Sequence, residues 1–297
     1  MAQDFSRCAE TVHTLLAGAE ARFSAVGIDT ARLDAEALLA HALTLDRAQL
    51  FARLRDGITT EAHGIFLKLV QRRARREPLA YIIGVREFWS LAFHITPAVL
   101  IPRPETELLV ETSLRILAEA QLLTSPLRLL DIGTGSGCLA IALAKELPRA
   151  EVWAVDLSLA ALAVAQDNAQ RLGVAARTHF LHSDLFSAFS QTELRFDLLV
   201  ANPPYIACGE IATLQPEVRD WEPHLALVGG TDGLDFYRRL LTDSPRYVRS
   251  GGRLLMEIGT SQAASVLDLF RHHATFANSS CLQDYAGHDR VVVAYAR

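Results

Sequence analysis

The chain has 297 residues, a mass of 32.6 kDa, a formal net charge of −5 and 50% hydrophobic residues. This length predicts two domains with a sizeable core, and the acidic balance argues against a protein whose main ligand is the nucleic-acid backbone. Because its four cysteines form no CxxC pair and no apolar stretch is long enough to span a membrane, we expect a cytoplasmic protein without a metal site.

Residues 1–83 predict a small all-helical domain. Apolar side chains recur at helical spacing in the first segment, and Ser/Thr/Asp caps precede the later ones. No segment in this part of the chain has the alternating pattern of a strand. The expected helices run from Phe5 to Phe23, from Asp29 or Thr30 to His41, briefly after Asp46, and from Thr59 or Thr60 to just before Pro78.

Four arginines gather at the end of the last of these helices. Cations near a helix C-terminus complement the helix dipole, and their usual position is a solvated face. The alternative is a surface that docks an RNA or a protein partner. The cluster consists of Arg72, Arg73, Arg75 and Arg76.

Residues 84–103 predict a β-hairpin that links the two domains. The stretch from Phe88 to Ile95 is aromatic and β-prone, with Ser90 at the turn. A helix then begins within the Pro102-Arg103-Pro104-Glu105-Thr106-Glu107 string and runs to about Leu123, because proline fits a first helical turn. Helix capping is one interpretation of Glu105 and Glu107, and a role beyond capping stays open from the sequence.

Strand and helix alternate from Leu127 to the end, so residues 104–297 predict an α/β domain with a mostly parallel sheet. The strand Leu127–Leu130 leads into Asp131-Ile132-Gly133-Thr134-Gly135-Ser136-Gly137 and a helix from Cys138. Alternating glycines let the backbone approach a ligand at a helix N-terminus. Cys138 stands where a dinucleotide fingerprint needs glycine, and no Lys-Ser/Thr pair follows, so neither that site nor a P-loop is predicted.

Two further strands of this domain end in acids. Asp156 follows Val152–Val155 and is placed to accept hydrogen bonds from both hydroxyls of an adenosine ribose. A helix cap is its other interpretation, although Ser158 already supplies one. Asp184 follows the strand Thr178–Leu181 and is placed to accept an adenine amino group, with Leu185 against the ring.

The apolar run Phe196–Ala201 predicts a buried strand that stops at Asn202-Pro203-Pro204-Tyr205. The Asn202 oxygen and the Pro203 carbonyl can accept both hydrogens of a planar –NH2 group, and Tyr205 can pack on its flat face. The alternative is a Pro-Pro turn with Asn202 as a cap.

The remaining elements follow in order. The loop 206–233 is long and polar, which predicts a substrate lid. After it we expect a helix over Leu234–Val248, a turn at Gly251-Gly252, a strand over Arg253–Ile258, a helix over Gln262–His272, and a β pair over Ala274–Leu282 and Arg290–Ala296.

These motifs, in this order and on strand ends, resemble class I methyltransferases that act on amino groups. More narrowly, the chain is similar over nearly its whole length to the peptide chain release factor glutamine methyltransferase (PrmC/HemK) family. The Arg103-Pro104-Glu105-Thr106-Glu107 string carries the specificity, because the sister family that methylates a ribosomal protein is expected to have Arg-Ser-Pro there. Arg76–Gly84 and Ala286–Arg290 also match.

The resemblance implies a Rossmann-like, mostly parallel seven-stranded sheet. It also implies transfer of methyl from S-adenosylmethionine, leaving S-adenosylhomocysteine, to the glutamine amide nitrogen of the Gly-Gly-Gln tripeptide in class 1 release factors. The helical domain is expected to hold the release factor, and we expect a monomer that binds no nucleic acid. The implied cofactor-binding residues are Gly133, Thr134, Gly135, Ser136, Gly137, Asp156, Asp184, Leu185 and Asn202; Asn202, Pro203, Pro204 and Tyr205 contact the glutamine, with Asn202, Pro203 and Tyr205 catalytic.

Two other functions stay open from the sequence. A nucleic-acid amine methyltransferase would use a similar pocket, since bases also carry planar –NH2 groups. A non-catalytic binder of S-adenosylmethionine would use the helical domain as an adaptor. The negative net charge weighs against the first, and the intact Asn202-Pro203-Pro204-Tyr205 string weighs against the second.

Overall fold

The computed structural model describes residues 7–271 and 273–297, which fall into two compact units. The helical unit comprises residues 7–84 and 215–221, and the sheet unit comprises residues 85–214 and 222–297. The chain therefore leaves the sheet unit once, after Leu214, and returns to it at Glu222. Within the described ranges, no helix combines the length and the apolar character needed to cross a membrane.

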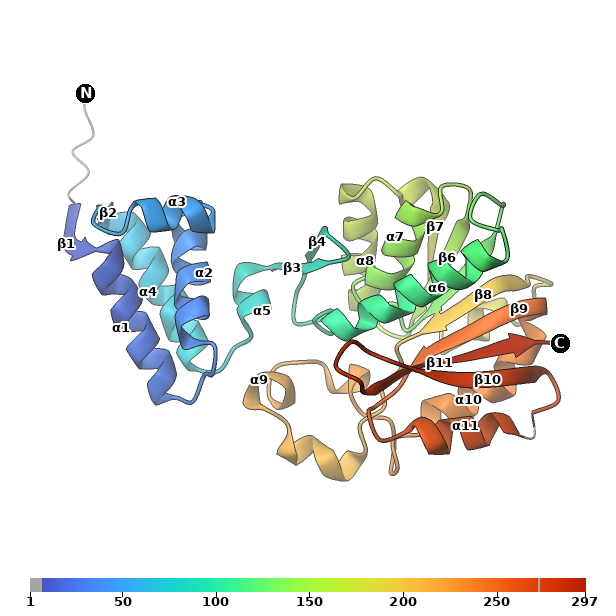
Figure 1. The fold of residues 1–297 in the computed structure, drawn as a ribbon. Helices are drawn as coiled ribbons and strands as arrows, with labels where there is room; N and C mark the ends of the chain where they lie inside the picture. Colours follow the sequence, from blue (N-terminus) through green and yellow to red (C-terminus); the bar gives the residue numbers. More distant parts are fainter. Residues whose placement is uncertain (1–6, 272) are drawn as a thin grey trace. The chain divides into compact units, whose positions relative to one another are not determined.

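The helical unit is built around an apolar core supplied by α1, α2 and α4 (Figure 1). Leu16, Phe23, Leu38 and Leu39 are fully buried there. Its helices are α1 (Val12–Ala25), α2 (Ala31–Leu43), α3 (Arg47–Ala52), α4 (Thr60–Ala74), α5 (Leu79–Ile83) and α9 (Pro216–Arg219).

The predicted caps are confirmed where side chains close the helices. Asp46 and Gln49 form a reciprocal capping box at α3, and Thr59 accepts from the backbone N–H of Ala62 at the start of α4. Thr30 precedes α2 without capping it, because its hydroxyl donates to Asp34 instead.

The expectation of no strand in this unit is wrong. Strand β1 (Arg7–Thr11) pairs antiparallel with β2 (Gly57–Thr59). The first helix begins at Val12, because Thr11 caps it by accepting from the Thr14 N–H. The predicted start at Phe5 lies outside the described residues. The three residues of β2 are too few for a two-residue alternation, and the sequence of β1 does not alternate apolar and polar residues.

The arginine cluster at the end of α4 is largely internal to the helical unit. Arg73 is only 5% exposed; its Nε atom donates to Asp34 over 2.7 Å, and its Nη1 donates to Glu217 over 2.9 Å. Arg76 pairs with the same Glu217 carboxylate at 2.6 Å. The segment 215–221 is thus held to α4 by charge-assisted hydrogen bonds.

The other two arginines of the cluster differ from each other. Arg72 pairs with the buried Glu77, whereas the Arg75 side chain is exposed. A solvated face therefore describes Arg75 but not its neighbours.

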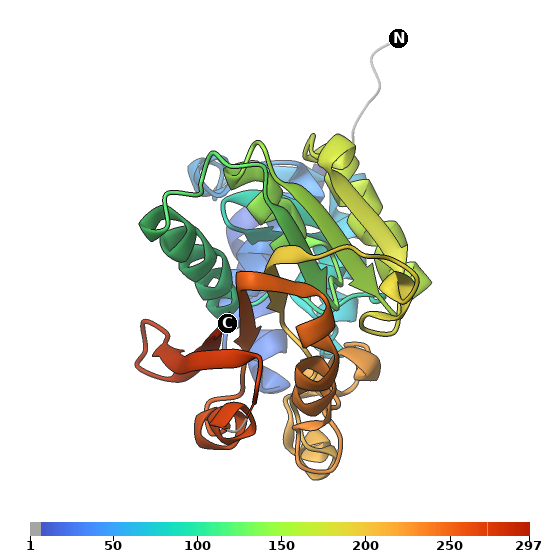
Figure 2. The same cartoon turned by 90° about the vertical axis from the view of Figure 1, so that its right-hand side faces the viewer.

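The sheet unit contains a seven-stranded sheet in the order β10-β11-β9-β8-β5-β6-β7. Strands β9, β8, β5, β6 and β7 are parallel, and β11 and β10 complete the sheet with antiparallel pairs. The predicted mostly parallel seven-stranded sheet is confirmed, and it is twisted as open sheets are (Figure 2). The strands are β5 (Arg128–Ile132), β6 (Glu151–Asp156), β7 (Thr178–His182), β8 (Phe196–Ala201), β9 (Val248–Glu257), β10 (Phe276–Gln283) and β11 (Asp289–Ala296).

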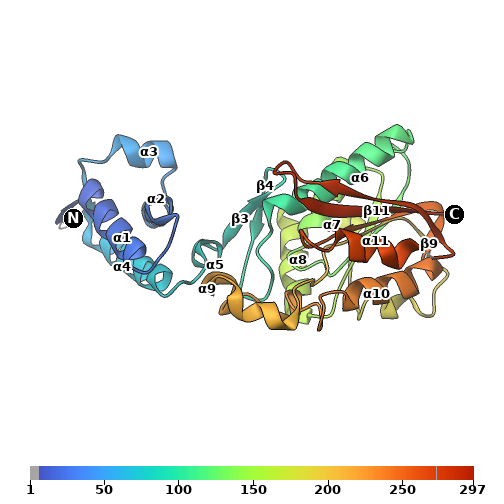
Figure 3. The ribbon, with the colours of Figure 1, turned by 60° about the horizontal axis from the view of Figure 1, so that its bottom comes forward.

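Helices cover both faces of this sheet. Helix α6 packs beside α7 and α8 on one face, and α10 and α11 lie on the other (Figure 3). The central strand β8 is therefore buried on both faces, as its unbroken apolar sequence requires. The helices are α6 (Glu107–Glu119), α7 (Cys138–Glu146), α8 (Leu159–Arg171), α10 (Asp235–Asp243) and α11 (Ala263–Arg271).

The predicted hairpin is confirmed as β3 (Val85–Phe88) and β4 (Leu91–His94). Trp89 and Ser90 both have positive φ, 52° and 56°, as a tight two-residue turn requires. The Glu107 carboxylate accepts a hydrogen bond from the Trp89 backbone N–H at 2.7 Å. Glu107 therefore holds the hairpin turn to the N-terminus of α6, where its negative charge also complements the helix dipole.

Three predicted boundaries in this unit need correction. Helix α6 ends at Glu119 rather than Leu123, and Gln121 then takes a left-handed conformation. Helix α10 ends at Asp243, because a 3-10 turn with Pro245 in its first positions follows. The Gly251-Gly252 pair is no turn: it lies inside β9 at a bulge, where a side chain on Gly252 would meet the Phe196 carbonyl.

Candidate active site

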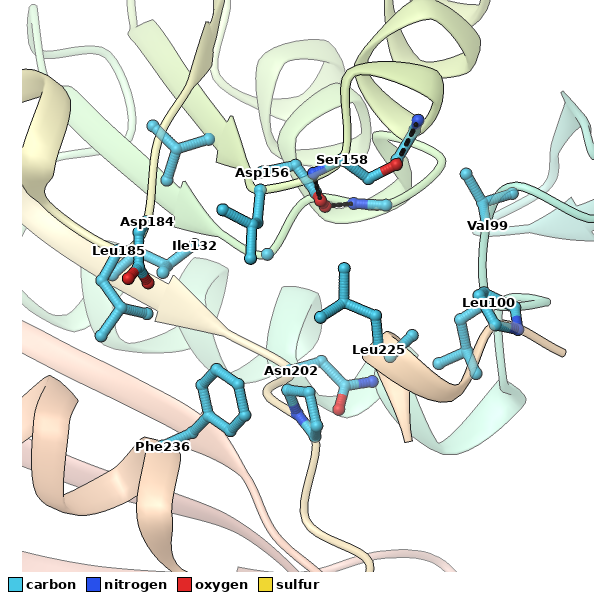
Figure 4. A pocket seen from close by; sticks show the side chains of 18 of the residues that line it. Val99, Leu100, Ile132, Asp156, Ser158, Asp184, Leu185, Asn202, Leu225 and Phe236 are labelled. Carbon is cyan, nitrogen blue, oxygen red and sulfur yellow. Dashed lines mark hydrogen bonds between the residues drawn. The ribbon is translucent and has the colours of Figure 1, made fainter. Parts of the chain in front are cut away.

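A pocket of about 200 Å³ lies at the carboxyl ends of the parallel strands, within the sheet unit (Figure 4). Open α/β sheets bind ligands at this edge. The predicted residues that line it are Gly133, Gly135, Asp156, Asp184, Leu185, Asn202 and Pro204; residues not predicted from sequence add an apolar wall that includes Val99, Leu100, Ile132, Leu225 and Phe236.

The carboxylate of Asp156 ties the glycine loop to the second strand. Its Oδ2 accepts from the Gly135 N–H at 2.9 Å, and its Oδ1 accepts from the Ser158 N–H at 2.8 Å. Each oxygen keeps a further lone pair for a ligand. Gly133 and Gly135 have φ of +75° and +55°, with open space where side chains would begin. Both glycines therefore leave the pocket floor to backbone atoms alone.

Thr134 does not line the pocket. It is 4% exposed, and its hydroxyl donates to Asp131 at 2.6 Å. The same Asp131 oxygen accepts from the Ala140 N–H at 3.2 Å, so this carboxylate organises the loop from behind. Burial raises the pKa of Asp131 to about 7.

Ser136 and Gly137 also lie behind the loop rather than on the pocket wall. Ser136 is 2% exposed. A Cβ on Gly137 would lie 2.9 Å from Cδ1 of Ile141 and 3.1 Å from Cβ of Ala165. This glycine therefore permits the close packing of α7 against α8, while its φ of +82° forms the turn into α7.

Asp184 and Leu185 form the far end of the pocket together with α10. The Asp184 carboxylate accepts from Arg239 at 2.7 Å, which leaves its second oxygen for a ligand. Leu185 is 8% exposed and has a φ of +50°, in a turn closed by the Ser183 hydroxyl. Phe236 lines the same end and supplies an aromatic ring that the sequence did not point to.

Asn202 lies at the pocket where β8 ends (Figure 4). Its Nδ2 atom donates to the Thr106 hydroxyl at 3.1 Å. Within the described ranges, no backbone N–H donates to the carbonyls of Pro203 or Pro204. This agrees with the expectation that the two prolines end the strand and leave their carbonyls outside the hydrogen-bond ladder of the sheet. Pro203 is buried and does not line the pocket, whereas Pro204 does.

Tyr205 is turned away from the pocket lining. Its hydroxyl reaches Glu257 at 3.4 Å, and its ring packs against the core of the sheet unit. Burial is the main cause that raises the Tyr205 pKa, with the Glu257 charge adding to it, so this hydroxyl stays protonated. The packing of the Tyr205 ring on a flat substrate group remains a prediction.

Glu257 is a site residue that the sequence analysis missed. It ends β9 and is 1% exposed; its Oε2 accepts from the Thr106 hydroxyl at 2.6 Å. Burial raises its pKa to about 7. The parallel register pairs Ala201 with Met256, which brings Glu257 level with Asn202. An acid at the end of an apolar strand, as at Asp156, was the available signal.

The loop after Tyr205 is fastened at both ends. Ile206 forms a parallel bridge with Val228, and the Gly229 N–H donates to the Ile206 carbonyl at 2.8 Å. Between these ends, the buried Glu222 pairs with Arg103 at 2.5 Å, and Leu225 lines the pocket. A lid role is still a prediction.

Two family models match the chain. The PrmC N-terminal domain matches residues 14–84, and the methyltransferase small domain matches residues 107–215. Among solved structures, human methyltransferase 10 domain containing protein has a TM-score of 0.51 at 17% identity, covering 71% of this chain and 90% of that one. That likeness supports the methyltransferase fold alone.

Curated relatives extend the match to nearly the full length. A release factor glutamine methyltransferase of Moorella thermoacetica is 46% identical over 97% of this chain and 99% of its own. Another of the same name, from Geobacter sulfurreducens, is 47% identical over 90% of each chain. The fold, the order of the site motifs and these relatives agree, and the chain belongs to the release factor glutamine methyltransferase family.

Proposed function

We propose that this protein transfers a methyl group from S-adenosylmethionine to the side-chain amide nitrogen of the glutamine in the Gly-Gly-Gln tripeptide of class 1 peptide chain release factors. The observation that carries the proposal is one pocket that combines Gly133, Gly135 and Asp156 with Asn202 at the next strand end. Family membership supplies the substrate class, since the relatives are named for release factor glutamine methylation.

The residues of the pocket fit the methyl donor. Asp156 keeps acceptor capacity for ribose hydroxyls, and Asp184 keeps an oxygen for an amino group. Leu185 and Phe236 offer apolar surface for a flat base, and Gly133 and Gly135 leave room for the chain of the donor. When bound, S-adenosylmethionine supplies a methyl group made electrophilic by its sulfonium.

The residues at the end of β8 position the acceptor amide. We expect the Asn202 Oδ1 atom, together with the Pro203 carbonyl, which lies outside the pocket described above, to accept the two hydrogens of the glutamine –NH2. This contact fixes the direction of the nitrogen lone pair. Neither group takes up a proton at neutral pH, so the rate comes from orientation and exclusion of water rather than from a strong base. The amide nitrogen loses one proton to solvent during or after the transfer, which leaves the methylated amide neutral.

The helical unit is proposed to hold the release factor. The match of this unit to the PrmC N-terminal domain supports a role in substrate recognition that is separate from catalysis. The exposed Arg75 is free of the internal ion pairs that occupy Arg73 and Arg76, so it is the member of that cluster best placed to meet a partner. We also propose that the protein acts in the cytoplasm, where release factors work, as a monomer and without binding nucleic acid.

A labelling assay tests the function. The protein is incubated with methyl-labelled S-adenosylmethionine and, separately, with a class 1 release factor, the same factor with its Gly-Gly-Gln glutamine changed to alanine, ribosomal protein, or RNA. Label on the unmodified release factor alone is the expected result. Label on ribosomal protein or RNA, or equal label on the alanine form of the factor, would contradict the proposal.

A further inference from the structure

A buried chain of hydrogen bonds runs from Glu257 to Asn202 through a threonine. The Thr106 hydroxyl lies 2.6 Å from Oε2 of Glu257 and 3.1 Å from Nδ2 of Asn202. Thr106 is 2% exposed and Glu257 is 1% exposed, so water does not compete for these contacts. Thr106 ends the 3-10 turn Pro104–Thr106 that precedes α6, Glu257 ends β9, and Asn202 directly follows β8.

Donor and acceptor chemistry fixes which group donates in each of these two hydrogen bonds. An ionised carboxylate only accepts, so the single hydroxyl hydrogen of Thr106 goes to Glu257. The Thr106 oxygen can then only accept from its other neighbour, which requires the –NH2 end of Asn202 to face it. The Oδ1 atom of Asn202 therefore points away from Thr106. Within the described ranges, no protein group donates a hydrogen bond to this oxygen.

We propose that Thr106 and Glu257 are positioning residues, which lock the Asn202 amide so that its oxygen rather than its nitrogen is offered to the substrate –NH2 group. The proposal rests on the proposed function, because it concerns how Asn202 receives an amide hydrogen. An inverted Asn202 would present a donor to a donor and repel the glutamine amide.

The lock depends on the charge of Glu257. When Glu257 is protonated, its own O–H can donate to the Thr106 oxygen. The Thr106 hydroxyl can then donate to the Asn202 Oδ1 atom, which inverts the amide. Burial raises the Glu257 pKa to about 7, which places this change in a measurable range. The other charged or titratable groups that bear on Glu257 are Arg290, which favours the ionised form, Glu105, which opposes it, and Tyr205, Tyr237 and Cys138.

Kinetics with matched variants test the lock. Thr106→Val keeps the shape and removes the hydroxyl, whereas Thr106→Ser keeps the hydroxyl. We expect kcat to fall about 100-fold in Thr106→Val and to recover to within about threefold of wild type in Thr106→Ser. S-adenosylmethionine affinity, measured by calorimetry, stays the same in both. Equal kcat values for the two variants would overturn the proposal.

The pH profile supplies a readout that mere loss of packing would not change. Wild-type kcat/KM for the release factor should fall about tenfold per pH unit below about pH 7, and Glu257→Gln should be slower and flat across this range. Since Asp131 has a similar raised pKa, the comparison with Glu257→Gln assigns the inflection. An inflection that persists in Glu257→Gln would overturn the lock.

A measurement without release factor separates this proposal from the function itself. The side-chain amide signals of Asn202 in 15N-labelled protein are assigned by their loss in Asn202→Asp. They should shift with a midpoint near pH 7 in wild type and stay constant in Glu257→Gln. If wild type fails to methylate the release factor, the proposed function is wrong and this titration alone decides the lock; pH-independent wild-type signals would refute it.

Discussion

The Oδ2 atom of Asp156 accepts a hydrogen bond from the backbone N–H of Gly135 at 2.9 Å, so the end of β6 holds the glycine loop that follows β5. One carboxylate thus serves two purposes in our account. It fixes the loop, and it offers its remaining lone pairs to the methyl donor.

Asp156→Ala should weaken binding of S-adenosylmethionine by about 10- to 100-fold, because it removes charge-assisted hydrogen bonds and frees the loop. At saturating donor, kcat should change less than the dissociation constant. Titration calorimetry measures the affinity, with Asp268→Ala as a control that removes the same charge from the exposed face of α11. An unchanged dissociation constant in Asp156→Ala would count against its role.

Alanine substitutions at two glycines of the loop after β5 should have different effects on stability and on donor binding. Gly137→Ala forces a Cβ to within 2.9 Å of Ile141 at a φ of +82°, so it should lower the free energy of unfolding by at least about 2 kcal/mol. Gly135→Ala has open space at a φ of +55° and should cost about 1 kcal/mol.

Binding separates the same two variants in the opposite sense. The new methyl of Gly135→Ala extends into the pocket and should weaken donor binding about tenfold, whereas Gly137→Ala should bind normally while folded. Urea denaturation and calorimetry on both proteins check the pair. Identical profiles would show that pocket-lining and packing glycines are not distinct here.

Glu257 should make stability fall as pH rises. Its pKa is raised from 4.5 to about 7 in the folded chain, so the folded state binds this proton more tightly than the unfolded state. Stability is therefore lost as pH rises through the window from about 4.5 to 7, by roughly 3 kcal/mol in total. Glu257→Gln lacks this loss, so its free energy of unfolding should rise relative to that of wild type by about 2.5 kcal/mol between pH 5 and pH 8.

Urea denaturation of both proteins at several pH values measures this difference. Asp131 titrates in the same range in both chains, so its contribution cancels. A stability difference between the two proteins that stays constant with pH would mean that the pKa of Glu257 is not raised in the folded state.

Arg73→Ala should destabilise the helical unit by about 3–5 kcal/mol, because it leaves the buried carboxylate of Asp34 without its cation. Arg75→Ala is the matched control, because it removes the same side chain two positions later, where it is exposed. It should change the free energy of unfolding by no more than about 0.5 kcal/mol. Native-state hydrogen exchange of α2 and α4 in the full chain measures both. Similar effects from the two substitutions would contradict the internal role of Arg73.

Much of the site was predictable because it lies at the ends of parallel strands. An apolar run stopped by two prolines identified β8 and Asn202, and an acid after an apolar strand identified Asp156. These signals are local, since each depends on a few neighbouring residues whose burial and backbone limits are fixed by their type. The structure places Asn202 and Asp156 on one pocket.

The parts that escaped prediction depend on distant pairing. Thr106 meets Glu257 across 151 positions and Asn202 across 96, and only the register of β8 with β9 brings them level. The Gly251-Gly252 pair shows the same limit. Two glycines are typical of a turn, but here a neighbouring strand turns them into a bulge.

The central claim is that Asn202 orients the glutamine amide for transfer. Single-turnover methyl transfer from saturating S-adenosylmethionine to a class 1 release factor, compared between wild type and Asn202→Ala, tests it most directly. We predict a rate at least about 100-fold lower in Asn202→Ala, with an unchanged thermal unfolding temperature. A rate within a few-fold of wild type in the folded variant would contradict the account.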